Sequence, residues 1–229
     1  MNDPEPLFKE PHKAVDVVNN LVSRIQSWPR WNDPEILARR QARDAEELAQ
    51  TVDERRLHWN VPRRYLRQPR HHPDWQAQLD QLAPLMGTGV MLVLLGSRGT
   101  GKTYLGVELL KFVTGLGRSG IYRTLMEFFV LVRSTYGGHG RTTEEDVMRQ
   151  HQAPALLVLD EVGKCGQTQW EDNVFFDLLN KRYAAEKDTV LVCNLTIEQL
   201  PEVFESSILS RIQETGGVVV CDWPSFRDK

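Results

Sequence analysis

The stretch from Gly96 to Thr103 constrains the fold of this chain more than any other. Its sequence, GSRGTGKT, matches the eight-residue phosphate loop G-x-x-x-x-G-K-[ST] at every fixed position. An apolar run, residues 90–95, precedes it and is typical of a buried parallel strand, and residues 104–113 place leucines and valines at helical spacing. A strand, a glycine-rich loop and a helix in this order predict a phosphate-binding loop in an α/β fold.

The composition of this loop assigns roles to its residues. Its glycines let backbone N–H groups surround a phosphate chain, and the positive end of the helix that begins at Lys102 points at the same anion. We expect Lys102 to reach the β- and γ-phosphates and the Thr103 hydroxyl to hold Mg²⁺. The other predicted nucleotide contacts in the loop are Gly96, Ser97, Arg98, Gly99, Thr100 and Gly101.

A second part of the same chemistry follows at residues 155–161, an apolar strand that ends in two carboxylates. We expect Asp160 to hold Mg²⁺ through its water shell and Glu161 to polarise the water that attacks the γ-phosphate. An acidic pair alone is a weak signal. Downstream of a complete phosphate loop, it predicts that the chain binds and hydrolyses a nucleoside triphosphate, with ATP and Mg²⁺ as cofactors.

Two polar residues later in the chain complete the predicted site. Asn194 ends a further buried strand, residues 189–194, and fits a sensor of the γ-phosphate. Arg211 lies near the end of the next predicted helix, residues 201–213, where a neighbouring subunit's nucleotide would need a cation. The predicted catalytic residues are therefore Glu161, Arg211 and Lys102, and we expect the chain to self-associate through its ATPase interface.

Composition sets limits on the class of protein. The 229 residues, 41% of them hydrophobic, allow one α/β core and a smaller appendage. The net charge of -3 excludes a uniformly basic nucleic-acid binder, although residues 23–70 carry eleven Arg against seven Asp and Glu. The three cysteines lack metal-ligand spacing, and the chain shows neither an export pattern nor a membrane-length apolar run. We expect a cytoplasmic protein with no membrane contact.

The chain before the phosphate loop has its own organisation. Apolar residues at helical spacing predict two helices over residues 12–59, a small hairpin that is either a solvated arm or a docking module for a partner protein. Residues 61–73 hold four Arg among three prolines and predict an extended basic linker, which is solvated or contacts phosphates. The predicted division is an N-terminal helical region at 1–60, the linker, and an ATPase core at 74–229.

From residue 61 to residue 227 the chain resembles the AAA+ helicase loaders of the DnaC type and their relatives, the IstB transposition helpers. Besides the phosphate loop, the segments that carry this resemblance are VPxRY at 61–65, LDEVG at 159–163, NLT at 194–196, SRI at 210–212 and DWxSFR at 222–227. The resemblance implies an AAA+ core with a central parallel sheet. Only 18 residues follow Arg211, too few for the helical lid that most AAA+ proteins place there, so we expect no lid.

The resemblance also implies a DNA-binding surface. In DnaC-like loaders one aromatic residue after the second core helix and another shortly after the acidic strand contact single-stranded DNA, and Tyr136 and Trp170 match these positions. Exposed aromatic rings stack on bases of any sequence, and Arg133 and Arg141 could neutralise phosphates beside them. The alternative for Trp170 is burial in the core.

The function that these expectations favour is an ATP-dependent helicase loader in DNA replication. Such a protein would bind the hexameric replicative helicase and single-stranded DNA, with slow ATP hydrolysis, stimulated by DNA or partner, switching assembly and release. The alternative is an IstB-like transposition helper that binds duplex DNA and a transposase. A small-molecule kinase is disfavoured because Glu161 and Arg211 suit a reaction that uses water, and a nucleotide-gated adaptor with negligible turnover stays open.

Overall fold

The computed structural model describes residues 60–67, 72–137, 142–163 and 168–226. All of them belong to the second of two compact units of the chain, residues 52–229, and only this unit is described below. The predicted N-terminal hairpin and Arg141 lie outside the described residues. Among the described helices, none is long and apolar enough to cross a membrane.

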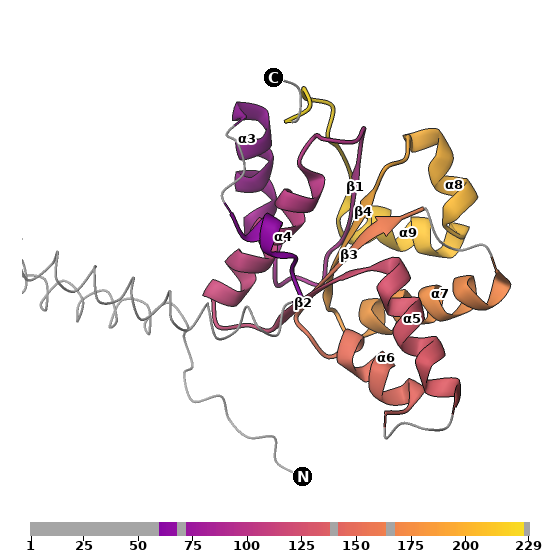
Figure 1. Cartoon of the computed structure of the whole chain (residues 1–229). Helices are drawn as coiled ribbons and strands as arrows, with labels where there is room; N and C mark the ends of the chain where they lie inside the picture. The colour runs from indigo at the N-terminus through magenta and orange to yellow at the C-terminus, as the bar shows by residue number, and fades with distance from the viewer. Residues whose placement is uncertain (1–59, 68–71, 138–141, 164–167, 227–229) are drawn as a thin grey trace, which may run out of the picture. The chain divides into compact units, whose positions relative to one another are not determined.

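A parallel sheet of five strands forms the centre of the described unit (Figure 1). Its order is β2-β3-β4-β1-β5, so that the strand before the phosphate loop lies between two others. The three strands predicted over residues 90–95, 155–161 and 189–194 are confirmed, and so is the α/β class with a central parallel sheet. The strands are β1 (Met91–Leu95), β2 (Gly120–Thr124), β3 (Leu156–Val162), β4 (Asp188–Cys193) and β5 (Gly217–Val220).

Helices connect the strands and cover both faces of the sheet. The described α-helices are α3 (Pro73–Leu82), α4 (Lys102–Gly115), α5 (Leu125–Ser134), α6 (Glu144–Gln152), α7 (Gln169–Ala184), α8 (Leu200–Val203) and α9 (Ser206–Thr215). The short 3-10 helices are η1 (Arg63–Leu66), η2 (Ala83–Leu85), η3 (Thr135–Gly137) and η4 (Ile197–Gln199). Within the described residues, no helix follows Thr215.

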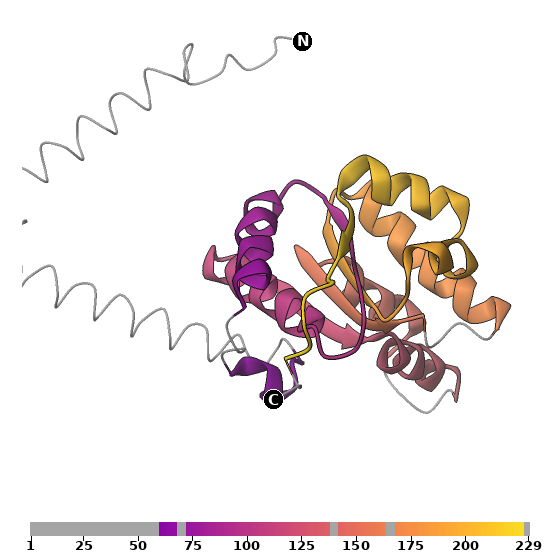
Figure 2. The ribbon, with the colours of Figure 1, turned by 90° about the horizontal axis from the view of Figure 1, so that it is seen from above.

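Alternate residues of each strand face two separate hydrophobic cores, because successive side chains of a strand point to opposite faces. In β1, Leu92 and Leu94 pack with α3 and α4, whereas Met91, Val93 and Leu95 pack with the helices of the other face. The two views of the ribbon show α3 and α4 on one side of the sheet and α5 to α9 on the other (Figures 1 and 2). Strands β1, β3 and β4 are buried on both faces, which explains why their sequences are nearly unbroken apolar runs.

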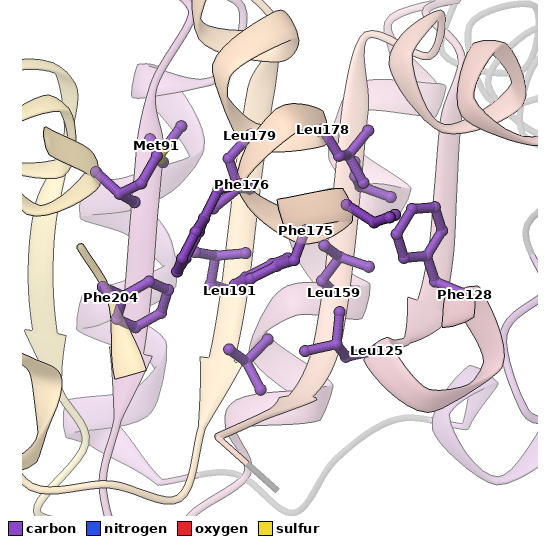
Figure 3. Close-up of a cluster of buried hydrophobic side chains, with 14 of the residues drawn as sticks. Met91, Leu125, Phe128, Leu159, Phe175, Phe176, Leu178, Leu179, Leu191 and Phe204 are labelled. Atoms are coloured by element: carbon purple, nitrogen blue, oxygen red, sulfur yellow. The ribbon is translucent and has the colours of Figure 1, made fainter. Parts of the chain in front are cut away.

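The larger core lies between the sheet and α7. Phe175, Phe176, Leu178 and Leu179 of this helix point at strand residues such as Leu159 and Leu191 (Figure 3). The sequence analysis assigned no element to residues 144–152 or 169–184. Both helices carry a local start signal, since Thr143 and Thr168 each accept a hydrogen bond from the backbone N–H three residues on.

Two other predictions differ from the structure. The helix predicted over residues 201–213 is divided into α8 and α9, because Phe204 leaves the helical conformation, with ψ of 135°, and buries its ring against Phe175. The segment predicted as an extended linker contains η1. There Tyr65 packs edge-on against Tyr104 of α4, with ring centroids 5.1 Å apart, so this part of the segment is folded onto the core.

Candidate functional site

The phosphate loop runs from the carboxyl end of β1 to the first turn of α4. Its glycines are required by geometry: Gly96, Gly99 and Gly101 have φ values of 136°, 94° and 80°, which other residues rarely adopt. A Cβ atom on Gly96 would also lie 2.3 Å from the backbone oxygen of Cys221. The local sequence therefore fixes a tight loop whose helix begins at Lys102.

Lys102 lies inside this loop. Its side chain is buried, and its ammonium donates hydrogen bonds to the backbone oxygens of Gly96, at 2.8 Å, and Ser97, at 2.6 Å. Thr100 is buried with its hydroxyl bonded to the Ser97 oxygen, while Ser97 and Arg98 are exposed at the tip. The cation is thus held where a phosphate chain enclosed by the loop would meet it.

Asp160 at the end of β3 joins the two predicted motifs. Its carboxylate accepts a hydrogen bond from the Thr103 hydroxyl at 2.8 Å, so the predicted pair of Mg²⁺ ligands is in contact. The same carboxylate oxygen accepts a bond of 2.8 Å from Tyr122, on the neighbouring strand β2. Burial, followed by the charge of Asp160, raises the pKa of Tyr122, which keeps this hydroxyl protonated as a donor.

The Thr103–Asp160 pair fits a magnesium ion. Mg²⁺ is usually held by one or two carboxylates together with phosphate oxygens and water rather than by a cage of protein ligands. Among the described residues, no group of three or more His, Cys, Asp or Glu could hold a metal ion. Burial raises the pKa of Cys221, beside the loop, to about 12, so this thiol is protonated and a poor ligand.

Glu161 occupies a strained position beside Asp160. Its φ is 60°, a left-handed conformation that is uncommon for a residue with a side chain, and its N–H donates to the Asp160 carboxylate at 2.7 Å. The pairing of β3 with β4 shifts register between Leu159 and Val162, so the strand is irregular at the acidic pair. Strain of this kind gathers at functional sites.

Asn194 follows β4 directly and is exposed. Since β4 lies between β3 and β1, Asn194 comes at the same edge of the sheet as the acidic pair and the phosphate loop. The structure therefore brings the predicted nucleotide and Mg²⁺ residues of three adjacent strands to one edge. Their roles stay predictions.

Arg211 lies apart from this edge. On the same helix, the Thr215 hydroxyl accepts a hydrogen bond from the N–H of Met91, the first residue of β1, so the end of α9 is at the opposite edge of the sheet. The Arg211 guanidinium lies over the Tyr183 ring, 4.9 Å from its centroid, with Nη1 buried and no hydrogen-bond partner. Arg211 thus packs on Tyr183 toward the edge opposite this chain's phosphate loop, and a role in a neighbouring subunit stays a prediction.

Three of the four predicted DNA-binding residues, Arg133, Tyr136 and Trp170, form a cluster where α5 ends and α7 begins. The Trp170 indole donates to the Tyr136 hydroxyl at 3.1 Å, and Arg133 lies 5.2 Å from the Trp170 ring centroid while bonding Glu171 at 2.6 Å. Tyr136 is 55% exposed, whereas Trp170 is half-buried against the core. Trp170 is thus partly buried, and its contact with DNA stays a prediction.

Three residues that contact the site were missed by the sequence analysis. Tyr122 bonds Asp160, and the indoles of Trp75 and Trp223 donate to backbone oxygens of the phosphate loop. Trp223 was noted only as part of the terminal segment DWxSFR, and no signal in the sequence singled out the other two.

Comparisons with known proteins agree with this geometry. A family model described as "IstB-like ATP binding protein" matches residues 74–229. Among curated proteins, the "Replicative helicase loader DnaC" of Escherichia coli (strain K12) is 22% identical over 144 residues, which are 62% of this chain and 58% of that protein. Its counterpart in Buchnera aphidicola (subsp. Baizongia pistaciae) is 22% identical over 138 residues, 60% of this chain and 56% of the relative. The matched part is thus little more than half of these relatives' length.

Solved structures share the fold. A crystal structure of DnaI superposes with a TM-score of 0.58 at 21% identity, covering 74% of this chain and 95% of that one. A crystal structure of the DnaC helicase loader gives 0.57 at 19% identity, covering 69% and 99%. At these identities the likeness establishes the α/β P-loop fold of AAA+ domains and nothing finer.

Proposed function

The chain belongs to the family of IstB-like ATP binding proteins, and from this membership we propose that it is an ATP-dependent loader of the hexameric replicative helicase. The observation that carries the proposal is the nucleotide site at one edge of the sheet, in which the loop lysine, the Thr103–Asp160 pair and Glu161 come together. The loader role is supported by the curated relatives, which are named as helicase loaders.

In the proposed chemistry, the loop's backbone N–H groups and Lys102 bind the phosphates of ATP. Mg²⁺, held by Thr103 and Asp160, would neutralise charge on the β- and γ-phosphates. Asp160 is already oriented for this task by bonds from Thr103, Tyr122 and the N–H of Glu161. Glu161 accepts the proton of the attacking water, and Asn194 orients the γ-phosphate.

We assign the last catalytic charge to a second subunit. Arg211 lies toward the edge opposite its own loop, so we assign it to the nucleotide of a neighbour. Hydrolysis would then depend on assembly, which suits a slow switch that DNA or the helicase stimulates. Mixing Lys102→Ala with Arg211→Ala protein should restore ATPase activity, because some interfaces then join an intact loop to an intact arginine. A mixture that co-assembles and stays inactive would contradict this assignment.

The aromatic cluster is the proposed contact to single-stranded DNA. Tyr136 offers an exposed ring on which a base can stack, a contribution of about 1–3 kcal/mol per base. Trp170 supports that ring through its hydrogen bond and core packing. The N-terminal region, residues 1–60, is the proposed contact to the helicase.

A transposition helper is the second candidate, and the family model favours it by description. Such a protein would share the ATP site and would bind a transposase and duplex DNA instead. A metabolite kinase is a weaker candidate, since a kinase must exclude the water that we assign Glu161 to activate.

One experiment separates the two leading candidates. The tagged full chain is incubated with the purified replicative helicase or with a transposase, in Mg·ATP or in Mg·ADP, and binding to single-stranded and duplex oligonucleotides is measured in parallel. A loader should retain the helicase in a nucleotide-dependent manner and prefer single strands. Retention of the transposase with a preference for duplex DNA would replace the proposal with the second candidate.

A further inference from the structure

The outer side of the phosphate loop is bonded by residues from two distant parts of the chain. The indole of Trp223, in the segment after β5, donates to the Thr100 oxygen at 2.6 Å. The N–H of Phe226 donates to the Gly99 oxygen at 2.8 Å, and the indole of Trp75, on α3, donates to the Gly101 oxygen at 3.2 Å. Three consecutive carbonyl groups of the loop are therefore held from outside.

These bonds have a consequence for the inner side of the loop. In a planar trans peptide, the C=O of one residue and the N–H of the next point in opposite directions. Holding the three oxygens outward directs the N–H groups of Thr100, Gly101 and Lys102 inward, toward the enclosed space. Converging N–H groups of this kind are what binds phosphate in such loops.

The contact is tightly packed as well as hydrogen-bonded. Trp75 is 1% exposed and Trp223 is 7% exposed. A Cβ atom on Gly101 would lie 2.4 Å from the Phe226 ring, so the ring occupies the space that any side chain at this loop position would need. The segment after β5 comes directly from the sheet, since the N–H of Cys221 still bonds the Leu95 oxygen (Figure 1).

We propose that Trp223, Trp75 and the backbone of Phe226 position the phosphate loop for its nucleotide, which makes the segment at residues 221–226 a working part of the ATP site. This inference rests on the proposed ATP-binding function. The three residues contact the loop's outer side and not the nucleotide, so they are positioning residues. Trp223 contributes most to holding the loop, because its hydrogen bond is the shortest of the three. Trp75 contributes less, because the Gly101 oxygen that it bonds has a second donor in the N–H of Leu105.

The test uses Trp223→Phe in the full chain, which removes the indole N–H and keeps an aromatic ring. Backbone order parameters of Thr100, Gly101 and Lys102 are measured by NMR without nucleotide, and the affinity for Mg·ATP is measured by calorimetry. We expect lower order at these three amides and a Kd raised roughly tenfold, the effect of one lost hydrogen bond. Trp75→Phe should act in the same direction by a smaller factor.

The control is Tyr183→Phe, which removes a side-chain bond of 2.8 Å to Glu214, away from the loop. It should change neither the loop amides nor the Kd. If Trp223→Phe lowers the melting temperature but binds Mg·ATP as the wild type does, the tryptophan only packs and the inference is overturned. If the wild type itself fails to bind Mg·ATP, the proposed function falls, and the order parameters alone decide whether Trp223 holds the loop.

Discussion

At the edge of the sheet where the strands begin, charged side chains bond scattered parts of the protein's backbone. At the edge where the strands end, charged side chains gather at a single phosphate loop. Among the residues that the structure describes, a buried cation lies at each edge: Arg182 is 0% exposed and Lys102 is 4% exposed. The two cations differ in the groups that they bond and in how easily a ligand could replace those groups.

At the amino edge, where the strands begin, Arg182 and Asp188 form hydrogen bonds with the backbone. The Arg182 guanidinium bonds the Thr189 hydroxyl and backbone oxygens of four residues: His151, Gln152, Pro154 and Asp188. The Asp188 carboxylate in turn accepts from the N–H groups of three residues: Gly87, Gly89 and Val90. Burial lowers the pKa of Arg182, but a guanidinium stays charged at neutral pH.

At the carboxyl edge, where the strands end, a ligand can replace the hydrogen-bond partners. The Lys102 ammonium bonds oxygens of the loop that it belongs to, on a flexible stem that can turn to a phosphate. Glu161 is held in a left-handed conformation that costs free energy and does not stabilise the fold. We infer that polar groups at the amino edge stabilise the fold, whereas those at the carboxyl edge are available to bind a ligand.

The largest effect is expected for Arg182→Met at the amino edge. Methionine has a similar length but leaves the bonded carbonyl groups buried without their donor and removes the positive charge near the Asp188 carboxylate, so unfolding should become easier by about 3–5 kcal/mol. Urea denaturation followed by circular dichroism measures this. If the variant does not fold, Arg182→Lys should recover part of the stability.

The matched control is Arg149→Met on α6, where the arginine bonds Glu145 and Asp146 at the surface. Exposed ion pairs contribute little, so this variant should unfold nearly as the wild type does. Equal losses in the two variants would mean that the amino edge has no special part in stability.

At the carboxyl edge, Glu161→Gln should lower the rate of ATP hydrolysis and leave the stability of the fold nearly unchanged. The amide keeps the shape of the side chain but cannot accept a proton, so ATP hydrolysis should fall at least roughly a hundredfold. Stability and Mg·ATP affinity should change little, because the loop and the Thr103–Asp160 pair are untouched. Glu145→Gln, at an exposed position of α6, serves as the control. Hydrolysis at the wild-type rate would remove Glu161 from the mechanism.

The third prediction concerns pH and the amino edge. His151 is fully buried with Nδ1 bonded to the Val147 oxygen, and burial lowers its pKa from 6.5 to about 4. Above pH 6.5 the imidazole is neutral in both the folded and the unfolded states, and stability is complete. As the pH falls below 6.5, only the unfolded state takes up the proton, so the free energy of unfolding decreases by about 1.4 kcal/mol per pH unit down to about pH 4.

His151→Phe should abolish this part of the pH dependence, because phenylalanine cannot be protonated. The measurement compares urea midpoints of the wild type and the variant between pH 7 and pH 5, above the range in which most carboxylates titrate. Parallel decreases in both proteins would assign the pH dependence to other groups.

The sequence could predict those parts of the site that lie in contiguous segments. The phosphate loop and the acidic pair are such segments, with residue types and spacing that indicate their chemistry, and the strands before them are unbroken apolar runs. The bonds of Arg182, Tyr122 and Trp223 join residues as many as 31, 38 and 123 positions apart, and no local pattern encodes them. Helices α6 and α7 were predictable from their capping threonines, whereas the break at Phe204 follows from core packing that only the fold reveals.

The smallest effect is expected for Tyr122→Phe. This variant tests whether one residue both stabilises the fold and supports the candidate site. Tyr122 belongs to the core of the α3 and α4 face and is 2% exposed, yet its hydroxyl bonds the Asp160 carboxylate that we assign to Mg²⁺. Losing one buried hydrogen bond should cost about 1 kcal/mol of stability. It should also loosen Asp160, although bonds from Thr103 and the N–H of Glu161 remain, so the Mg²⁺ concentration for half-maximal ATPase activity should rise a few-fold.

The control for this variant is Tyr104→Phe, which removes an exposed bond of 3.1 Å to the Arg64 oxygen. It should leave the Mg²⁺ dependence unchanged. A Tyr122→Phe protein that loses stability with an unchanged Mg²⁺ dependence would place Tyr122 with the amino-edge residues, as a group that serves the fold alone. A shift in Mg²⁺ dependence without a loss of stability would place it wholly with the site. We expect a result between these, because the Tyr122 ring packs in the core while its hydroxyl bonds Asp160, so the candidate nucleotide site at this edge is supported by the core beneath it.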